Sequence, residues 1–262
     1  MSQEKTSLAN KFGENLDILL RKPQGKKKLP CVILVQGIGM DMHEWKNSHD
    51  EIAKRLVHQN FATVQFNFSY QKNVTDTLDS EIGLAKRAKE LEDVIAWTVK
   101  NPHLDPVRVG IYAMSFGVST VLLTSLHHIR SLCLTCGIGF RPENYIKRYL
   151  NRGDTINKDG ETRLTRSSGK TMIVQADFWP SLENLRQEEL VAKLRIPVFV
   201  VHGNLDEYVT NDDMQCVYGA IKSRGKKLKV YNGAHHGFDD APKKIHDEFL
   251  HDVLKWFKTT LI

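Results

Sequence analysis

The sequence predicts an α/β fold in which a doubly wound, mostly parallel sheet carries helices on both faces. Apolar, strand-like runs alternate with amphipathic helical patterns along most of the 262 residues. Most of the strand-like runs are apolar throughout, which is typical of parallel strands buried on both faces. A chain of this length with 41% hydrophobic and 26% charged residues can form one domain with a sizeable core.

The expected strands and helices follow from these patterns in chain order. An edge strand is predicted over 15–23 and a short strand at 171–174. Buried parallel strands are predicted over 29–36, 61–69, 107–114, 130–138, 196–203 and 227–233. Helices are predicted over 44–60, 82–101 and 245–261, where apolar residues recur every three or four positions. Ligand sites of such a sheet lie at the carboxyl ends of its strands.

Residues 140–190 interrupt this alternation. They are polar and irregular, with stretches such as NRGDTINKDGETR. A long insertion in a compact domain is often a lid over the active site. The expected organisation is therefore a core of residues 1–139 and 191–262 and a cap of residues 140–190.

Charge and hydropathy limit the partners that this chain can have. Its net charge of +6 arises from 37 basic and 31 acidic residues, so most charges have neighbours of opposite sign. The basic clusters at 21–28 and 224–229 lie beside glycine or proline and lack interleaved aromatic residues, so we expect no nucleic-acid partner. The polar first residues and the absence of a long apolar run predict a cytoplasmic protein without membrane insertion. The oligomeric state stays open, a homodimer included.

Three motifs resemble cofactor or metal sites, but each departs from the pattern that such a site requires. In QGIGMDM (36–42), Met42 occupies the third glycine position of a dinucleotide loop. SSGKT (167–171) lacks the first glycine of a phosphate loop and lies in the cap region. Cys133 and Cys136 form a C-x-x-C, but their odd offset on a strand sends them to opposite faces. We therefore expect neither cofactor nor metal, and buried, reduced cysteines.

Ser115 lies where the strand at 107–114 meets a helix-like run of small and apolar residues. A serine on a sharp strand-to-helix turn needs small neighbours, which Ala113 and Gly117 provide. The turn exposes the hydroxyl at the positive end of a helix, where backbone N–H groups can stabilise an oxyanion. The alternative is a serine that merely caps a buried helix.

A nucleophilic serine requires a base and an orienting acid, and both types follow later in the chain. Asp206 lies just past the strand at 196–203, and His236 lies just past the strand at 227–233. Because both loops lie at the carboxyl edge of the same sheet as Ser115, the order Ser, Asp, His predicts a catalytic triad. An ordinary turn aspartate and a solvated loop histidine are the alternatives.

At these positions the chain resembles the α/β-hydrolase superfamily of serine hydrolases, over nearly its whole length. Its G-x-S-x-G motif occurs here with Ala113 in place of the first glycine. The resemblance implies Ser115 as nucleophile, Asp206 as acid and His236 as base. His235 is the rival base. His236 is preferred because the base of this family is commonly followed by Gly-Phe, and here Gly237 and Phe238 follow His236.

The same resemblance implies an oxyanion hole formed by the N–H groups of Ile38 and Phe116. Gln36 stands where the family typically has histidine, a residue that mostly shapes the loop, so the replacement concerns loop packing more than catalysis. The cap position is most similar to that of compact bacterial esterases such as feruloyl and cinnamoyl esterases. Aromatic residues of the cap can line an acyl pocket or pack the lid onto the core; of Tyr145, Tyr149, Phe178 and Trp179, the last two are the predicted pocket wall.

The expected function is serine-dependent hydrolysis of small carboxylic esters with short or compact aromatic acyl groups, through an acyl-enzyme. A thioesterase or acyltransferase and a small serine peptidase are the alternatives within enzymes, because the sequence does not reveal the leaving group. A catalytically inactive binding protein with the same fold is the alternative outside them. The presence of all three triad residue types argues against that last alternative.

Overall fold

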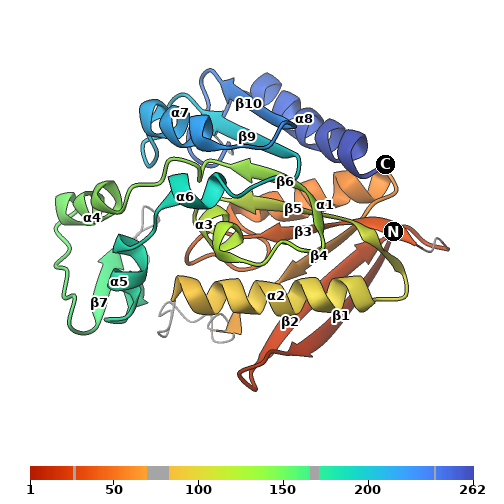
Figure 1. Cartoon of the computed structure of the whole chain (residues 1–262), viewed down its shortest axis with the longest axis horizontal. Coiled ribbons are helices and arrows are strands. Elements are labelled where there is room, and N and C mark those ends of the chain that lie inside the picture. Colours follow the sequence, from red (N-terminus) through yellow and green to blue (C-terminus); the bar gives the residue numbers. More distant parts are fainter. Residues whose placement is uncertain (26–27, 70–82, 166–170, 239) are drawn as a thin grey trace.

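The computed structural model describes residues 1–25, 28–69, 83–165, 171–238 and 240–262. Its centre is an eight-stranded sheet with the strand order β1-β2-β4-β3-β5-β6-β9-β10 (Figure 1). The six strands from β4 to β10 in this order are parallel to one another, whereas β1 and β2 add to the margin in antiparallel fashion. The predicted, mostly parallel α/β sheet is therefore confirmed.

Apart from β1, the strands of the sheet lie close to the predicted ranges. They are β1 (Ser2–Ala9), β2 (Asn15–Lys22), β3 (Leu29–Val35), β4 (Ala62–Phe66), β5 (Leu104–Met114), β6 (Ile129–Thr135), β9 (Val198–Gly203) and β10 (Lys226–Tyr231). In β3, β4 and β9 every residue is buried, as expected of strands with helices on both faces.

The prediction that residues 15–23 form an edge strand is wrong in one respect. β2 lies between β1 and β4, and β1 pairs with it from Ser2 opposite Lys22 to Ala9 opposite Asn15. β1 itself was missed because its sequence, SQEKTSLA, is polar and mostly exposed. A polar strand at a sheet margin carries little hydrophobic signal, and its charges also discourage pairing with other chains.

Five long helices cover the two faces of the sheet. α1 (Ser48–His58) and α8 (Lys243–Leu261) pack on one face, and α2 (Leu84–Lys100), α3 (Phe116–Leu123) and α7 (Asn211–Ala220) pack on the other. The stripes of α2 and α8 have the predicted spacing; in α8 the buried residues include Phe249, Val253 and Phe257. Ile82, where the predicted helix 82–101 begins, lies outside the described residues. No helix within the described ranges is both long and apolar enough to cross a bilayer.

Between β6 and β9 the chain forms several small elements. These are α4 (Pro142–Asn151), β7 (Thr162–Thr165), β8 (Thr171–Val174), α5 (Phe178–Glu183) and α6 (Gln187–Val191). β8 is the predicted short strand and pairs with β7 in antiparallel fashion. Figure 1 shows α4, β7 and α5 together at one end of the molecule. Of the SSGKT segment, only Thr171 belongs to the described residues.

Candidate active site

Ser115 occupies a strained turn between β5 and α3. Its backbone has φ 54° and ψ −124°, a conformation that is rare for residues with a side chain and that clusters at functional sites. The N–H of Ser115 donates to the carbonyl oxygen of Thr135 at 2.9 Å, which anchors the turn to the end of β6. The hydroxyl is thereby held at the carboxyl edge of the sheet.

Two glycines allow the chain to approach this turn closely. A Cβ on Gly117 would lie 2.6 Å from the carbonyl oxygen of Val35 and 2.7 Å from that of Gln36. A Cβ on Gly137 would lie 2.2 Å from the carbonyl oxygen of Ser115. Ala113, in place of the usual glycine, is fully buried in β5, so the extra methyl group is accommodated.

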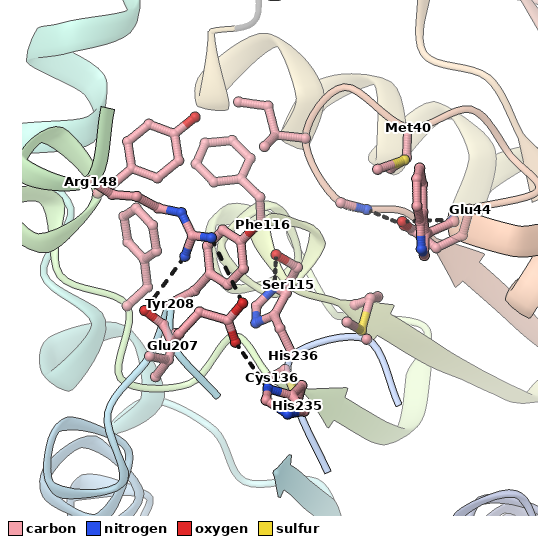
Figure 2. A pocket seen from close by; sticks show the side chains of 18 of the residues that line it. Met40, Glu44, Ser115, Phe116, Cys136, Arg148, Glu207, Tyr208, His235 and His236 are labelled. Atoms are coloured by element: carbon pink, nitrogen blue, oxygen red, sulfur yellow. Dashed lines mark hydrogen bonds and ion pairs between the residues drawn. The ribbon is translucent and has the colours of Figure 1, made fainter. Parts of the chain in front are cut away.

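The structure brings Ser115, His236 and Asp206 together in one hydrogen-bonded chain. His236 Nε2 lies 2.7 Å from Ser115 Oγ (Figure 2), and His236 Nδ1 lies 2.8 Å and 3.0 Å from the two carboxylate oxygens of Asp206. When Nδ1–H donates a hydrogen bond to Asp206, the lone pair of Nε2 faces the serine hydroxyl. This is the tautomer that a general base requires.

The carboxylate of Asp206 is kept ionised although it is buried. Burial alone would raise its pKa, but the charge of His236 and the hydrogen bond from it lower the pKa below its ordinary value. The N–H groups of Tyr208 and Val209 also donate to Oδ1, at 2.8 and 3.1 Å. His202 lies behind the carboxylate, and burial lowers its pKa, so it is a neutral neighbour.

His235, the rival base, lies elsewhere. Its side chain is 46% exposed, and its Nδ1 is 3.5 Å from the carboxylate of Glu207. The adjacent residues of this loop therefore point in different directions, and it is the ring of His236 that reaches Ser115 (Figure 2).

The two residues predicted to form the oxyanion hole lie on the same cavity as Ser115. Phe116 is the first residue of α3, so its N–H has no acceptor within that helix. The loop after β3 carries Ile38 and is held from two sides. The N–H of Gly37 donates to Glu44 Oε2 at 2.6 Å, and the side chain of Gln36 donates to the carbonyl oxygen of Phe66 at 2.9 Å.

Arg87 and Glu44 support this loop, and sequence reasoning missed both. Arg87 is fully buried and donates to the carbonyl oxygen of Gln36 at 2.8 Å and to Thr120 Oγ1 at 2.9 Å. It was detectable as the one cation in the apolar stripe of the helix at 82–101. Glu44, with φ 60°, follows no such pattern, because its contact with Gly37 depends on the turn that separates them.

A cavity of about 340 Å³ opens above Ser115 and His236. Its wall on the side of the insertion is formed by aromatic and cationic residues, including Phe140, Tyr145, Arg148, Tyr149 and Arg152. On the core side lie Met40, Trp45, Tyr208, Ser115 and His236.

The prediction that Phe178 and Trp179 form the pocket wall is wrong. Both are fully buried, and neither is among the residues that line the cavity. Phe178 packs behind Phe116 and Tyr145, with ring centroids 6.0 and 6.3 Å away, and Trp179 packs edge-on against Phe178. They belong to the hydrophobic core beneath the insertion, because α5 turns its apolar face toward α4 and α2.

Among the described residues, one group of side chains is close enough to hold a metal ion. Ligand atoms of Cys136, Asp206 and His236 lie within 4.8 Å of one another. Burial raises the pKa of the Cys136 thiol well above its ordinary value, which opposes the thiolate that a metal prefers. Both ring nitrogens of His236 are already hydrogen-bonded, so this arrangement suits proton transfer better than metal binding.

Comparison with known proteins agrees with this geometry. Residues 183–239, which include Asp206 and His236, match a family described as serine aminopeptidase, S33. The ferulic-acid-bound Est1E structure from Butyrivibrio proteoclasticus is similar over 97% of this chain and 99% of that one, with a TM-score of 0.76 and 19% identity. The chain has the α/β-hydrolase fold.

Other proteins are similar over the whole length of this α/β-hydrolase fold. The esterase domain of a Rhodothermus marinus protein has a TM-score of 0.72 and 15% identity, with both chains covered completely. An uncharacterized 31.7 kDa protein of Escherichia coli is 22% identical over 96% of this chain and 98% of its own. The predicted resemblance to α/β hydrolases and their esterases is confirmed.

Proposed function

We propose that this chain is a serine hydrolase that cleaves small carboxylic esters through an acyl-enzyme. The observation that carries the proposal is the unbroken chain from Ser115 Oγ through the imidazole of His236 to the carboxylate of Asp206, with contacts of 2.7 and 2.8 Å. These distances lie within the range of proton transfer between positioned groups. An inactive binding protein would have no need for the strained turn at Ser115.

In the proposed reaction, His236 Nε2 takes the hydroxyl proton of Ser115 as Oγ attacks the ester carbonyl carbon. The N–H groups of Ile38 and Phe116 stabilise the oxyanion, and Asp206 stabilises the imidazolium without taking its proton. Collapse of the intermediate breaks the bond to the alcohol oxygen, which receives the proton from His236. Water then attacks the acyl-enzyme with His236 again as base, releasing the acid and Ser115.

We further propose that residues 140–190 act as a cap and that the acyl group is short or a compact aromatic. A cavity of about 340 Å³ lies at the small end of ligand sites. Phe140, Tyr145 and Tyr149 give it an aromatic wall against which a planar acyl group can stack. Est1E, a structural neighbour, was solved with ferulic acid, which is consistent with such a substrate.

The experiment that tests this function is turnover of p-nitrophenyl esters from acetate to palmitate, together with phenolic-acid esters such as methyl ferulate. The expected result is activity that peaks at short or aromatic acyl groups and is abolished in Ser115→Ala. Activity that keeps rising to palmitate contradicts the compact pocket. Activity that survives in Ser115→Ala contradicts the serine mechanism.

A serine peptidase is the second candidate, because the matching family is described as serine aminopeptidase, S33. The same triad can cleave amides, and the leaving group alone separates the two reactions. Aminoacyl p-nitroanilides, assayed beside the esters, distinguish them. A kcat/KM for an anilide that exceeds that of every ester would favour the peptidase.

A further inference from the structure

Arg148 projects from α4 of the insertion into the cavity that contains Ser115 (Figure 2). Its guanidinium carbon lies 3.1 Å from the ring centroid of Tyr208. The ring of Tyr208 in turn packs on that of His236, with centroids 4.4 Å apart. A cation from the insertion is therefore stacked, through one aromatic ring, on the proposed catalytic base.

The guanidinium of Arg148 is largely buried, yet its contacts with oxygen atoms are long. Its side chain is 18% exposed, and burial lowers its pKa. The nearest carboxylate, Glu207, is 3.8 Å away, and the carbonyl oxygen of Glu207 is 3.5 Å away. Good charge-assisted hydrogen bonds are about 2.7–2.9 Å long. Within the described part of the chain, the buried Nε of Arg148 has no hydrogen-bond partner.

Arg141, at the start of the same helix, shows what a structural ion pair looks like in this protein. It lies 2.6 Å from Glu188 and 2.9 Å from Asp213. Its hydrogen bonds to these two carboxylates raise its pKa, despite partial burial. Arg141 thus fastens the insertion to the core with tight bonds. Arg148 has comparable exposure, but the oxygens of Glu207 lie 3.5 and 3.8 Å from its guanidinium nitrogens.

The partner of Arg148 can be displaced. The carboxylate of Glu207 is on a side chain that is 54% exposed, and it also lies 3.5 Å from His235 (Figure 2). Because Glu207 is more than half exposed and its carboxylate is 3.8 Å from the guanidinium, water screens the attraction between the two charges. An incoming anion could therefore replace Glu207 at Arg148 while Glu207 stays with His235 or turns to solvent.

A second guanidinium adds to the positive charge of this wall. Arg152 follows Arg148 by one helical turn, lines the same cavity and donates to the carbonyl oxygen of Thr165 at 3.0 Å. Tyr145 and Tyr149, on the same helix, also line the cavity. The acidic Glu44 lies on the opposite, core side, where its oxygens accept backbone N–H groups.

We propose that Arg148 binds a carboxylate of the substrate, so that the natural ester carries an anionic group remote from the bond that is cleaved. The planar guanidinium can engage a carboxylate through two parallel hydrogen bonds. Stacking on Tyr208 fixes its plane at little further cost in conformational entropy. This inference rests on the proposed esterase function, because it names the substrate class of the same site.

The test compares anionic and neutral esters of equal length in the unmodified protein and in Arg148→Gln. One pair places the charge on the acyl group: the p-nitrophenyl half-ester of adipic acid and its methyl-capped form. A second pair places it on the leaving group: 4-carboxyphenyl butyrate and its methyl ester. We expect the unmodified protein to prefer the anionic member of at least one pair, as measured by kcat/KM.

Arg148→Gln is expected to lower that preference by about tenfold to hundredfold, with a much smaller loss on the neutral ester. Added salt should weaken the preference of the unmodified protein in the same direction. Lys147→Gln is the matched control. It removes an equal charge from an exposed position of α4, outside the cavity, and should retain the preference.

Three results would overturn the inference. They are equal or better use of the neutral esters in both pairs, an unchanged preference in Arg148→Gln, and an equal loss on charged and neutral esters in that variant. The last would assign Arg148 a structural role only. Failure of the proposed function has a different signature, because then Ser115→Ala hydrolyses the neutral esters as fast as the unmodified protein, or neither hydrolyses any ester.

Discussion

Arg87 Nη2 donates to the carbonyl oxygen of Gln36 at 2.8 Å, although the two residues lie on α2 and at the end of β3. The same guanidinium donates from Nε to Thr120 of α3 and packs over the rings of Phe68 and Phe116. It therefore joins the loop of Ile38 to the helix of Phe116, the two sources of the proposed oxyanion-hole N–H groups. A buried cation at this position holds the two donors at a fixed separation.

Replacing Arg87 with methionine should lower kcat for ester hydrolysis about tenfold to hundredfold, with a smaller change in KM. Displacing oxyanion donors weakens an interaction that is strongest in the transition state. Steady-state kinetics with p-nitrophenyl butyrate measure the effect. Lys89→Met, on the exposed side of the same helix, should have kcat close to that of the unmodified protein. A rise in KM alone would mean that Arg87 shapes substrate binding instead.

The two adjacent histidines should differ by orders of magnitude when each is replaced with alanine. His236→Ala removes the base that contacts Ser115, and kcat should fall at least about a thousandfold. His235→Ala removes an exposed side chain and should change kcat only a few-fold. Asp206→Asn should approach the loss of His236→Ala, because a neutral amide neither fixes the tautomer with the proton on Nδ1 nor stabilises the imidazolium. The reverse ranking of the histidine variants would assign the base to His235.

The acyl-length profile should respond to Tyr149 and not to Trp179. Tyr149→Ala opens the cavity wall, so longer acyl chains should gain up to about fourfold in kcat/KM for each methylene that the new space accepts. Trp179→Leu should lower the melting temperature, since it leaves space in a packed cluster, but keep the profile of the unmodified protein. If Trp179→Leu instead prefers longer acyl chains than the unmodified protein, Trp179 would have to be part of the pocket wall.

Acid should destabilise the protein through His49, a buried residue of α1. Burial lowers the pKa of its side chain to about 3. Since an unfolded histidine titrates near pH 6.5, the unfolded state binds an extra proton between about pH 6.5 and 3. The free energy of unfolding therefore decreases as the pH is lowered through this window, by about 2 kcal/mol from pH 7 to pH 5. Urea unfolding should show this loss reduced in His49→Gln and unchanged in His58→Gln, an exposed control. Equal pH dependence of all three proteins would contradict it.

Local sequence was enough to predict every strand of the main sheet except β1, and the loops that carry Ser115, Asp206 and His236. Each follows a strand of the parallel part of the sheet, and parallel strands end at one edge, so their loops had to converge. The cavity wall was harder, because it depends on how α4 and α5 pack on each other. Tyr149 and Trp179 are both aromatic residues of the insertion, and only tertiary structure separates the lining residue from the core residue.

Contacts between residues far apart in the sequence were equally difficult to predict. The stack of Arg148 on Tyr208 joins α4 to the loop after β9, and no local pattern signals it. β1 escaped detection for a different reason, since its stability comes from pairing with β2 and not from a buried apolar stripe.

The central claim, that Ser115 is a nucleophile activated by His236, is tested most directly by labelling with a fluorophosphonate. The protein and its Ser115→Ala variant are treated at neutral pH, and intact mass is followed by peptide mapping. We predict one adduct per chain, located on Ser115, with no adduct in Ser115→Ala and much slower labelling in His236→Ala. Labelling that persists in Ser115→Ala, or that maps to Ser119, would contradict the account.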